Sequence, residues 1–198
     1  MEGARRGAGV PADTTMKWLP LRESTAESLA VSMAGIRLGD RLLVVGCSDP
    51  LLIAQLASKT GLTGRAHAVD ERDAVVANAA RIALGEGALV ETSVSSFGTL
   101  SLDAASFDVA VVRDVLTRVA PETRPAVLAE IRRVLRPGGR CLVIDSMPHG
   151  LRALIRTPSA SVDYVALLQA AGFKAARVLA ERVGQVFAEA VNPIPMKP

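Results

Sequence analysis

The feature that most constrains this chain is a repeated alternation between short apolar runs and longer helical patterns. RLLVV (41–45) and FDVAVV (107–112) carry no regular polar alternation, which is typical of strands covered on both faces. Between such runs, apolar residues recur at helical spacing, as in PAVLAEIRRVL (125–135). Alternating strands and helices predict a parallel sheet with right-handed crossovers and helices on both faces.

The same patterns set the expected order of elements along the chain. We expect helices from Ser24 and over 50–59, 73–84, 125–135 and 162–171, and strands over 41–45, 65–70, 88–92, 107–112 and 140–145. KAARVLAERV and QVFAEAV then flank Gly184 like a hairpin. The predicted fold is a doubly wound, Rossmann-like α/β sheet, mostly parallel, with a C-terminal antiparallel hairpin. We expect a flexible lead-in (1–23), one domain (24–192) and a tail (193–198).

Composition excludes several classes of protein. Aromatic residues are only 3% of the chain, which argues against modules that stack nucleic-acid bases on exposed rings. The densest basic group is expected to be a solvated face: Arg132, Arg133, Arg136 and Arg140. Two cysteines form no disulfide framework, and no Cys/His cluster has zinc spacing, so no metal site is predicted. Without a membrane-length apolar run or a signal-peptide pattern, we expect a soluble, cytoplasmic protein.

Two longer stretches carry a family resemblance. SFDVAVVRDVLTRVAPETRPAVLAEIRRVLRPGGRCLVID (106–145) and LLQAAGFKAARV (167–178) resemble the class I methyltransferases. They are most similar to the small-molecule group that includes the quinone-biosynthesis C-methyltransferases. The resemblance spans roughly residues 24–190 and implies the class I methyltransferase fold. It also implies S-adenosylmethionine as cofactor and a small molecule as methyl acceptor.

The loop after the first strand departs from the family pattern. The family has an acidic residue followed by G-x-G-x-G, whereas this chain has V-V-G-C-S-D-P (44–50). Gly46 matches the first glycine and Ser48 the second, with Cys47 between them as a further cofactor-binding candidate. Val44 stands where the family's acid helps to hold the ammonium group of the cofactor, and Pro50 replaces the third glycine.

Asp49 has two interpretations. Asp followed by Pro is a good start for a helix, because Asp can cap the first turn and Pro has its φ pre-set. A carboxylate at that helix start would compete with the methionine carboxylate of the cofactor. Alternatively, Asp49 could replace the missing acid and contact the ammonium group.

The resemblance also assigns residues after the second and third strands. Asp70 ends the second strand, where the family's acid accepts hydrogen bonds from both ribose hydroxyls, and Glu71 follows it as a cofactor-binding candidate. The alternative is that Asp70 caps the next helix, with Asp73 in its first turn. Ser93 is the expected equivalent of an Asp that meets the adenine amino group.

Substrate-side candidates follow the fourth and fifth strands. Arg113 could clamp an anionic substrate group through its planar guanidinium, or it could pair with Asp114. His149, just past Asp145, would be the natural general base if one is needed; the alternative is a solvated histidine in a loop. Only residues 146–161 separate the fifth strand from the next helix, so we expect a thin roof over the pocket or one completed by a partner.

These features give a leading function and alternatives. The first is S-adenosylmethionine-dependent methyl transfer to a small molecule, with Arg113 orienting the substrate. The second is a methyltransferase-like pseudoenzyme that has lost cofactor binding and acts as a partner or structural subunit. The third is binding of another adenosine-containing ligand. A homo-oligomer is compatible with each of them, and none requires a membrane span.

Overall fold

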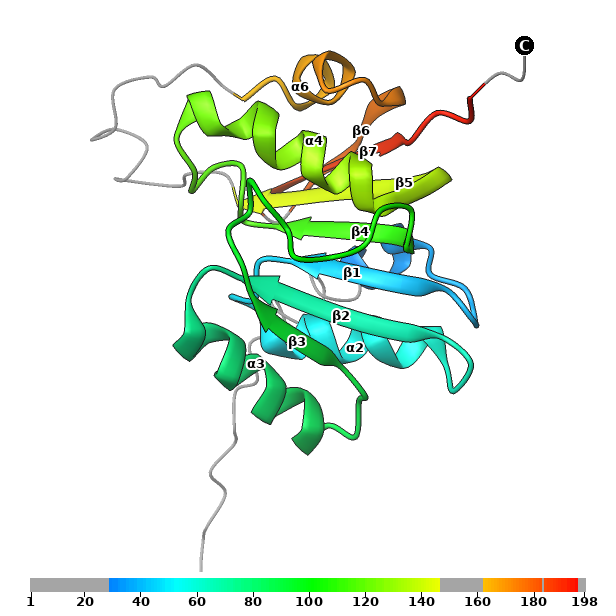
Figure 1. Ribbon diagram of the computed structural model, residues 1–198, viewed down its shortest axis with the longest axis vertical. Coiled ribbons are helices and arrows are strands. Elements are labelled where there is room, and N and C mark those ends of the chain that lie inside the picture. Colours follow the sequence, from blue (N-terminus) through cyan, green and yellow to red (C-terminus); the bar gives the residue numbers. More distant parts are fainter. Residues whose placement is uncertain (1–28, 147–161, 183, 196–198) are drawn as a thin grey trace, which may run out of the picture.

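The predicted doubly wound sheet is confirmed by the computed structural model, which describes residues 29–146, 162–182 and 184–195. Its strands lie side by side in the order β3-β2-β1-β4-β5-β7-β6 (Figure 1). They are β1 (Arg41–Val45), β2 (Arg65–Asp70), β3 (Glu91–Val94), β4 (Phe107–Arg113), β5 (Leu135–Ser146), β6 (Lys174–Arg182) and β7 (Gln185–Val191). The first five are parallel, whereas β7 pairs antiparallel with both β5 and β6.

Helices cover both faces of the sheet. They include α2 (Pro50–Thr60), α3 (Asp73–Gly85), α4 (Arg124–Val134) and α6 (Tyr164–Ala170), with a 3-10 turn, η1 (Pro121–Thr123). Residues 29–34 are also helical, in agreement with the helix expected from Ser24 over the part that is described. One core cluster joins α4 and α6 to strand residues such as Leu43 and Val45. The other joins α2 and α3 to Leu42 and Val44, the alternate residues of the same strand. β1 is therefore apolar from Leu42 to Val45 because both of its faces are buried there.

Two strand boundaries differ from the predicted ones. β3 begins at Glu91, because residues 86–90 are used to close α3: the N–H of Ala88 bonds to the Ala83 carbonyl and Gly87 has φ 71°. β5 begins at Leu135, five residues before the predicted start. The Pro137-Gly138-Gly139 segment, which lies between the predicted helix (125–135) and the predicted strand (140–145), instead continues β5 through a register shift against β4. There Gly138 and Gly139 exchange backbone hydrogen bonds with Asn192.

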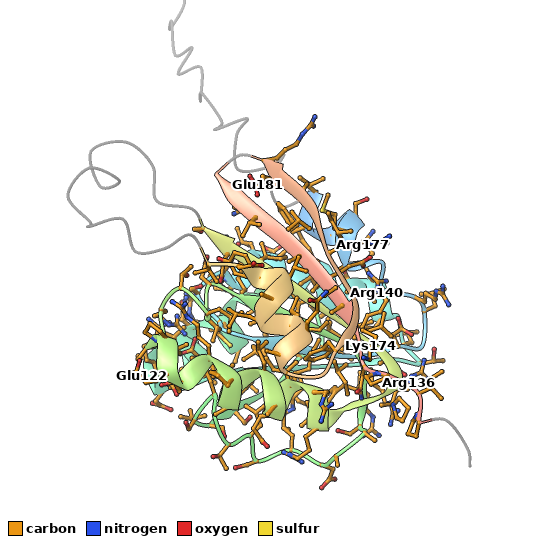
Figure 2. All side chains as sticks on the ribbon, turned by 90° about the horizontal axis from the view of Figure 1, so that it is seen from above. Glu122, Arg136, Arg140, Lys174, Arg177 and Glu181 are labelled. Carbon is orange, nitrogen blue, oxygen red and sulfur yellow. The ribbon has the colours of Figure 1, made fainter. Side chains whose placement is uncertain are left out.

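The basic group singled out in the sequence is largely ion-paired. Figure 2 shows Arg136, Arg140 and Arg177 along one side of the molecule in that view. Arg136 Nε lies 2.8 Å from Asp108 Oδ1, and both Arg140 and Arg177 pair with Glu189. Of the predicted solvated group, Arg132, Arg133 and Arg136 are exposed, whereas Arg140 is part-buried and donates to the Met33 carbonyl. Within the ranges described, no helix is long and apolar enough to cross a bilayer.

Candidate functional site

The carboxyl ends of the parallel strands bring the predicted site residues to one edge of the sheet. The strand order reverses at β1, which has β2 on one side and β4 on the other. In doubly wound sheets the crevice at such a reversal is where ligands bind. Gly46, Asp70, Arg113 and Asp145 all lie at or just beyond strand ends at this edge.

Gly46 makes the turn that allows these strand ends to approach one another. Its φ is 95°, in a region that other residues rarely adopt. Its N–H donates to the Val69 carbonyl at 2.8 Å. A Cβ built on Gly46 would lie 2.2 Å from the carbonyl oxygen of Arg113. Only glycine fits this position, so the first glycine of the family pattern is structurally required here.

Asp49 caps helix α2, and Pro50 occupies the first turn, as the capping interpretation predicts. Asp49 Oδ1 accepts a hydrogen bond from the N–H of Leu52 at 3.2 Å. The other oxygen is 3.6 Å from Arg113 Nη2, so the cap also forms an ion pair across the crevice. Ser48, just before the cap, is exposed. Val44 is buried in the core cluster beneath α2, where it offers no polar group to a ligand.

Asp70 is fully buried and is held by an array of nitrogen donors. Oδ2 accepts from the N–H of Cys47 at 3.0 Å, and Oδ1 accepts from the backbone N–H of Arg72 at 3.2 Å. The Arg72 guanidinium contacts both oxygens, and Arg118 Nη2 lies 3.3 Å from Oδ2. The alternative interpretation, in which Asp70 caps the next helix, is wrong. Helix α3 begins after Arg72, and no side chain caps it. Asp70 instead ties the glycine turn to the end of β2.

These contacts fix the charge states at the turn. Burial acts to raise the pKa of Asp70, but hydrogen bonds from Arg72 and Cys47 and the charge of Arg118 outweigh it and lower the pKa to about 2. Burial, followed by the nearby Asp70 charge, raises the pKa of the Cys47 thiol to about 12. Asp70 is therefore ionised at neutral pH, and Cys47 is an inert thiol that contributes its backbone N–H.

Glu71 and Ser93 occupy different surroundings. Glu71 Oε1 accepts from the N–H of Phe97 at 3.1 Å, which fastens the segment after β3 to the end of β2. Ser93 lies inside β3, and its hydroxyl is 2.8 Å from His67 Nε2. The predicted position after the third strand was therefore wrong for Ser93, because β3 extends to Val94.

Sequence reasoning missed Arg118, which follows β4. Its guanidinium reaches Asp70, 48 residues earlier, and lies 5.3 Å from the centroid of the Phe97 ring. A separation of that length leaves no local signal in the sequence. Arg72 was also missed, although it lies only two residues after Asp70.

Arg113 is buried and pairs with carboxylates from two elements. Nη1 lies 3.1 Å from Asp114 Oδ2, and Nη2 faces Asp49. The predicted pairing of Arg113 with Asp114 is therefore present, although the Arg113 guanidinium is buried and not on the surface. Nε and Nη1 are buried without a hydrogen bond from the described part of the chain. Nε thus has no partner among the described residues, whereas Nη1 meets Asp114 as an ion pair without hydrogen-bond geometry.

A second buried acid lies at the end of β5. Asp145 has no exposed surface, and neither carboxylate oxygen has a hydrogen-bond partner of good geometry among residues 29–146, 162–182 and 184–195. Tyr164, at the start of α6, is the neighbouring polar side chain that interacts with it. His149, the predicted general base, lies outside the described residues.

Comparisons with known proteins agree with this architecture. A family model described as "Methyltransferase domain" matches residues 42–139. An uncharacterized 37.1 kDa protein from a transposon of Streptomyces fradiae is 33% identical over 117 residues, covering 59% of this chain and 33% of that protein. The chain therefore spans about a third of the length of this curated relative.

Solved structures match over most of the chain. A SAM-dependent methyltransferase from Aquifex aeolicus superposes with a TM-score of 0.70 at 20% identity, covering 83% of this chain and 88% of its own. The [4+2]-cyclase SpnF gives 0.67 at 18% identity, with 86% and 82% covered. A complex of the Haloferax volcanii Trm112 methyltransferase activator with its methyltransferase gives 0.68 at 17%, with 89% and 92% covered. At these identities the similarity concerns the fold.

Proposed function

We propose that the chain is a class I S-adenosylmethionine-dependent methyltransferase that transfers a methyl group to a small-molecule acceptor, in line with the methyltransferase-domain model that matches residues 42–139. One observation carries the proposal. The glycine turn at Gly46 lies against an ionised, buried Asp70 at the end of the neighbouring strand. This is the arrangement that a ribose-containing cofactor requires at a sheet edge.

The residues at the ribose end fit the cofactor. Asp70 supplies two ionised oxygens for the ribose hydroxyls, and Gly46 lets the backbone approach the ligand closely. The ribose would have to displace a guanidinium, because Arg72 and Arg118 now occupy both oxygens. Glu71 positions the segment after β3, and the hydroxyl of Ser93 would need to exchange its His67 contact to reach adenine.

At the methionine end of the cofactor, the ion pair of Asp49 and Arg113 would take the place of the family's acidic residue. Asp49 would receive the ammonium group, and the Arg113 guanidinium would receive the carboxylate or an anionic group of the acceptor. The exposed Ser48 and the N–H of Cys47 would line the loop between them. In this arrangement the Asp49–Arg113 pair compensates for Val44. The bound cofactor supplies an electrophilic sulfonium methyl, so the protein's main task is alignment with the acceptor.

A second candidate function has its own support. The Asp70 carboxylate is already satisfied by internal donors, and Val44 offers nothing to an ammonium group. These features favour a pseudoenzyme that acts as a partner subunit. One similar structure is a methyltransferase in complex with an activator protein, and a comparable partner could complete the site here. With either function, we expect the protein to work in the reducing cytoplasm, in line with the free, buried Cys47 and Cys141.

Ligand-induced stabilisation tests the proposal. S-adenosylmethionine or S-adenosylhomocysteine at about 100 times its dissociation constant should stabilise the protein by about 2.7 kcal/mol. For a domain of this size the melting temperature should rise by roughly 5–10 °C. Asp70→Asn should abolish the rise, whereas Asp103→Asn, at an exposed position, should leave it intact. No shift with either ligand at millimolar concentration would refute methyl transfer and favour the partner-subunit function.

A further inference from the structure

Asp145 is a buried acid that the cofactor end of the site does not use. It lies in β5 directly after the apolar residues Val143 and Ile144, and it has no exposed surface. Both carboxylate oxygens are buried without a hydrogen bond of good geometry from any part of the chain that is described. An apolar side chain would avoid the loss of hydration that an unpartnered carboxyl suffers here. Packing alone therefore does not explain an Asp at this position.

The backbone around Asp145 is held rigidly by its neighbour on β4. Asp114, with φ 50°, donates its N–H to the Ile144 carbonyl at 2.9 Å. Its side-chain oxygen accepts from the N–H of Ser146 at 2.6 Å. These two bonds bracket Asp145 on both sides along the chain. They fix the backbone of Asp145 near the end of β5, at the edge of the sheet where the parallel strands end.

Charged and titratable groups from three elements act on Asp145. Burial and the Asp114 charge raise its pKa to about 6, while Tyr164, Arg113 and the N–H of Thr117 act in the opposite direction. Burial, followed by the charge of Asp145, raises the pKa of Tyr164 above its usual range, so its hydroxyl stays protonated. Near neutral pH, Asp145 is therefore a carboxyl group that can gain or lose a proton, and it lies beside the neutral phenol of Tyr164.

We propose that Asp145 binds a hydroxyl or amine of the methyl acceptor over the ends of β4 and β5, with Tyr164 beside it. The proposal rests on the methyl-transfer function above for the identity of this ligand. Both acceptor groups share one chemistry, a hydrogen-bond donor, which is what an unpartnered carboxylate requires. The site lies beyond the β4 and β5 ends, away from the Asp70 end of the crevice.

The same geometry assigns a destination for the acceptor's proton. As the acceptor's oxygen or nitrogen forms its bond to the methyl carbon, the carbon–sulfur bond breaks and its electron pair stays with sulfur. The acceptor then loses a proton, and the Asp145 carboxylate receives it. A carboxyl group that titrates near neutral pH is suited to this exchange. Asp145 would thus act as a catalytic residue and also select acceptors that carry a donor group.

Fragment binding tests the proposal without cofactor. We would compare phenol with anisole, its methyl ether, and benzylamine with toluene, by NMR titration of the full chain at pH 8. Wild-type protein should bind phenol and benzylamine at least about fivefold more tightly than their matched partners, because only these donate a hydrogen bond to the carboxylate. The preference should vanish in Asp145→Leu and weaken in Asp145→Asn. It should persist in Asp103→Asn, a control at an exposed position.

Two results would overturn this assignment. One is equal binding of the matched fragments, or no binding, by the wild type. The other is a donor preference that survives in Asp145→Leu, or one that is undiminished in Asp145→Asn if the leucine variant does not fold. Calorimetry with S-adenosylmethionine separates this failure from failure of the proposed function. Both Asp145 variants should keep the wild-type cofactor affinity if Asp145 serves only the acceptor. A wild type that prefers donors but does not bind the cofactor would refute methyl transfer alone.

Discussion

Gly46→Ala should destabilise the protein more than an alanine at any surface glycine. At φ 95° a non-glycine residue costs about 1–3 kcal/mol, and the new Cβ would lie 2.2 Å from the carbonyl oxygen of Arg113. Because that oxygen belongs to the backbone, the end of β4 must move, which costs roughly 1–3 kcal/mol more. Together these amount to about 2–6 kcal/mol, or a fall in melting temperature of roughly 5–20 °C.

Urea denaturation and thermal melting of two control variants separate the causes. Gly87 also has a positive φ, 71°, but a Cβ there would meet nothing within 4 Å, so Gly87→Ala should cost only about 1–2 kcal/mol. Gly85, at the end of α3, has neither problem, and Gly85→Ala should be neutral or slightly stabilising. Equal losses for Gly46→Ala and Gly87→Ala would show that the approach of β1 to β4 is not what requires glycine.

Three further outcomes follow from the contacts of the acidic residues. Arg118→Gln should strengthen cofactor binding about 2–5-fold in calorimetry, because it removes one of the donors that occupy Oδ2 of Asp70; weaker binding would mean that Arg118 holds the ligand. Asp49→Ala should cost about 1 kcal/mol of stability, as should Asp163→Ala at the cap of α6, but only the first should lower cofactor affinity. Asp145 has a folded-state pKa raised to about 6, so its stabilising effect is complete below pH 4 and lost as the pH rises through 6. Asp145→Asn should therefore gain up to about 3 kcal/mol relative to wild type between pH 4 and 8, and parallel pH–stability curves for the two proteins would contradict this.

Local sequence determined the order and type of the secondary structure. Runs without regular polar alternation predicted the buried strands β1 and β4, and Asp49 followed by Pro50 predicted the start of α2. These signals act within a few residues, since they depend on side-chain periodicity and capping. The boundaries of β3 and β5 were less accurate, because the closing turn of α3 and the pairing of Gly138 with Asn192 involve backbone bonds that no local pattern specifies.

Only the tertiary structure decided which side chains meet at the crevice. The sequence indicated Asp70 and Arg113 as site residues, but not that Arg118 would contact the first or Asp49 the second. Such partners come from strands and loops that are distant in the chain, and parallel pairing alone brings their ends together. Whether Asp145 is exposed or buried likewise depends on what packs over β5, so its raised pKa is a property of the folded molecule.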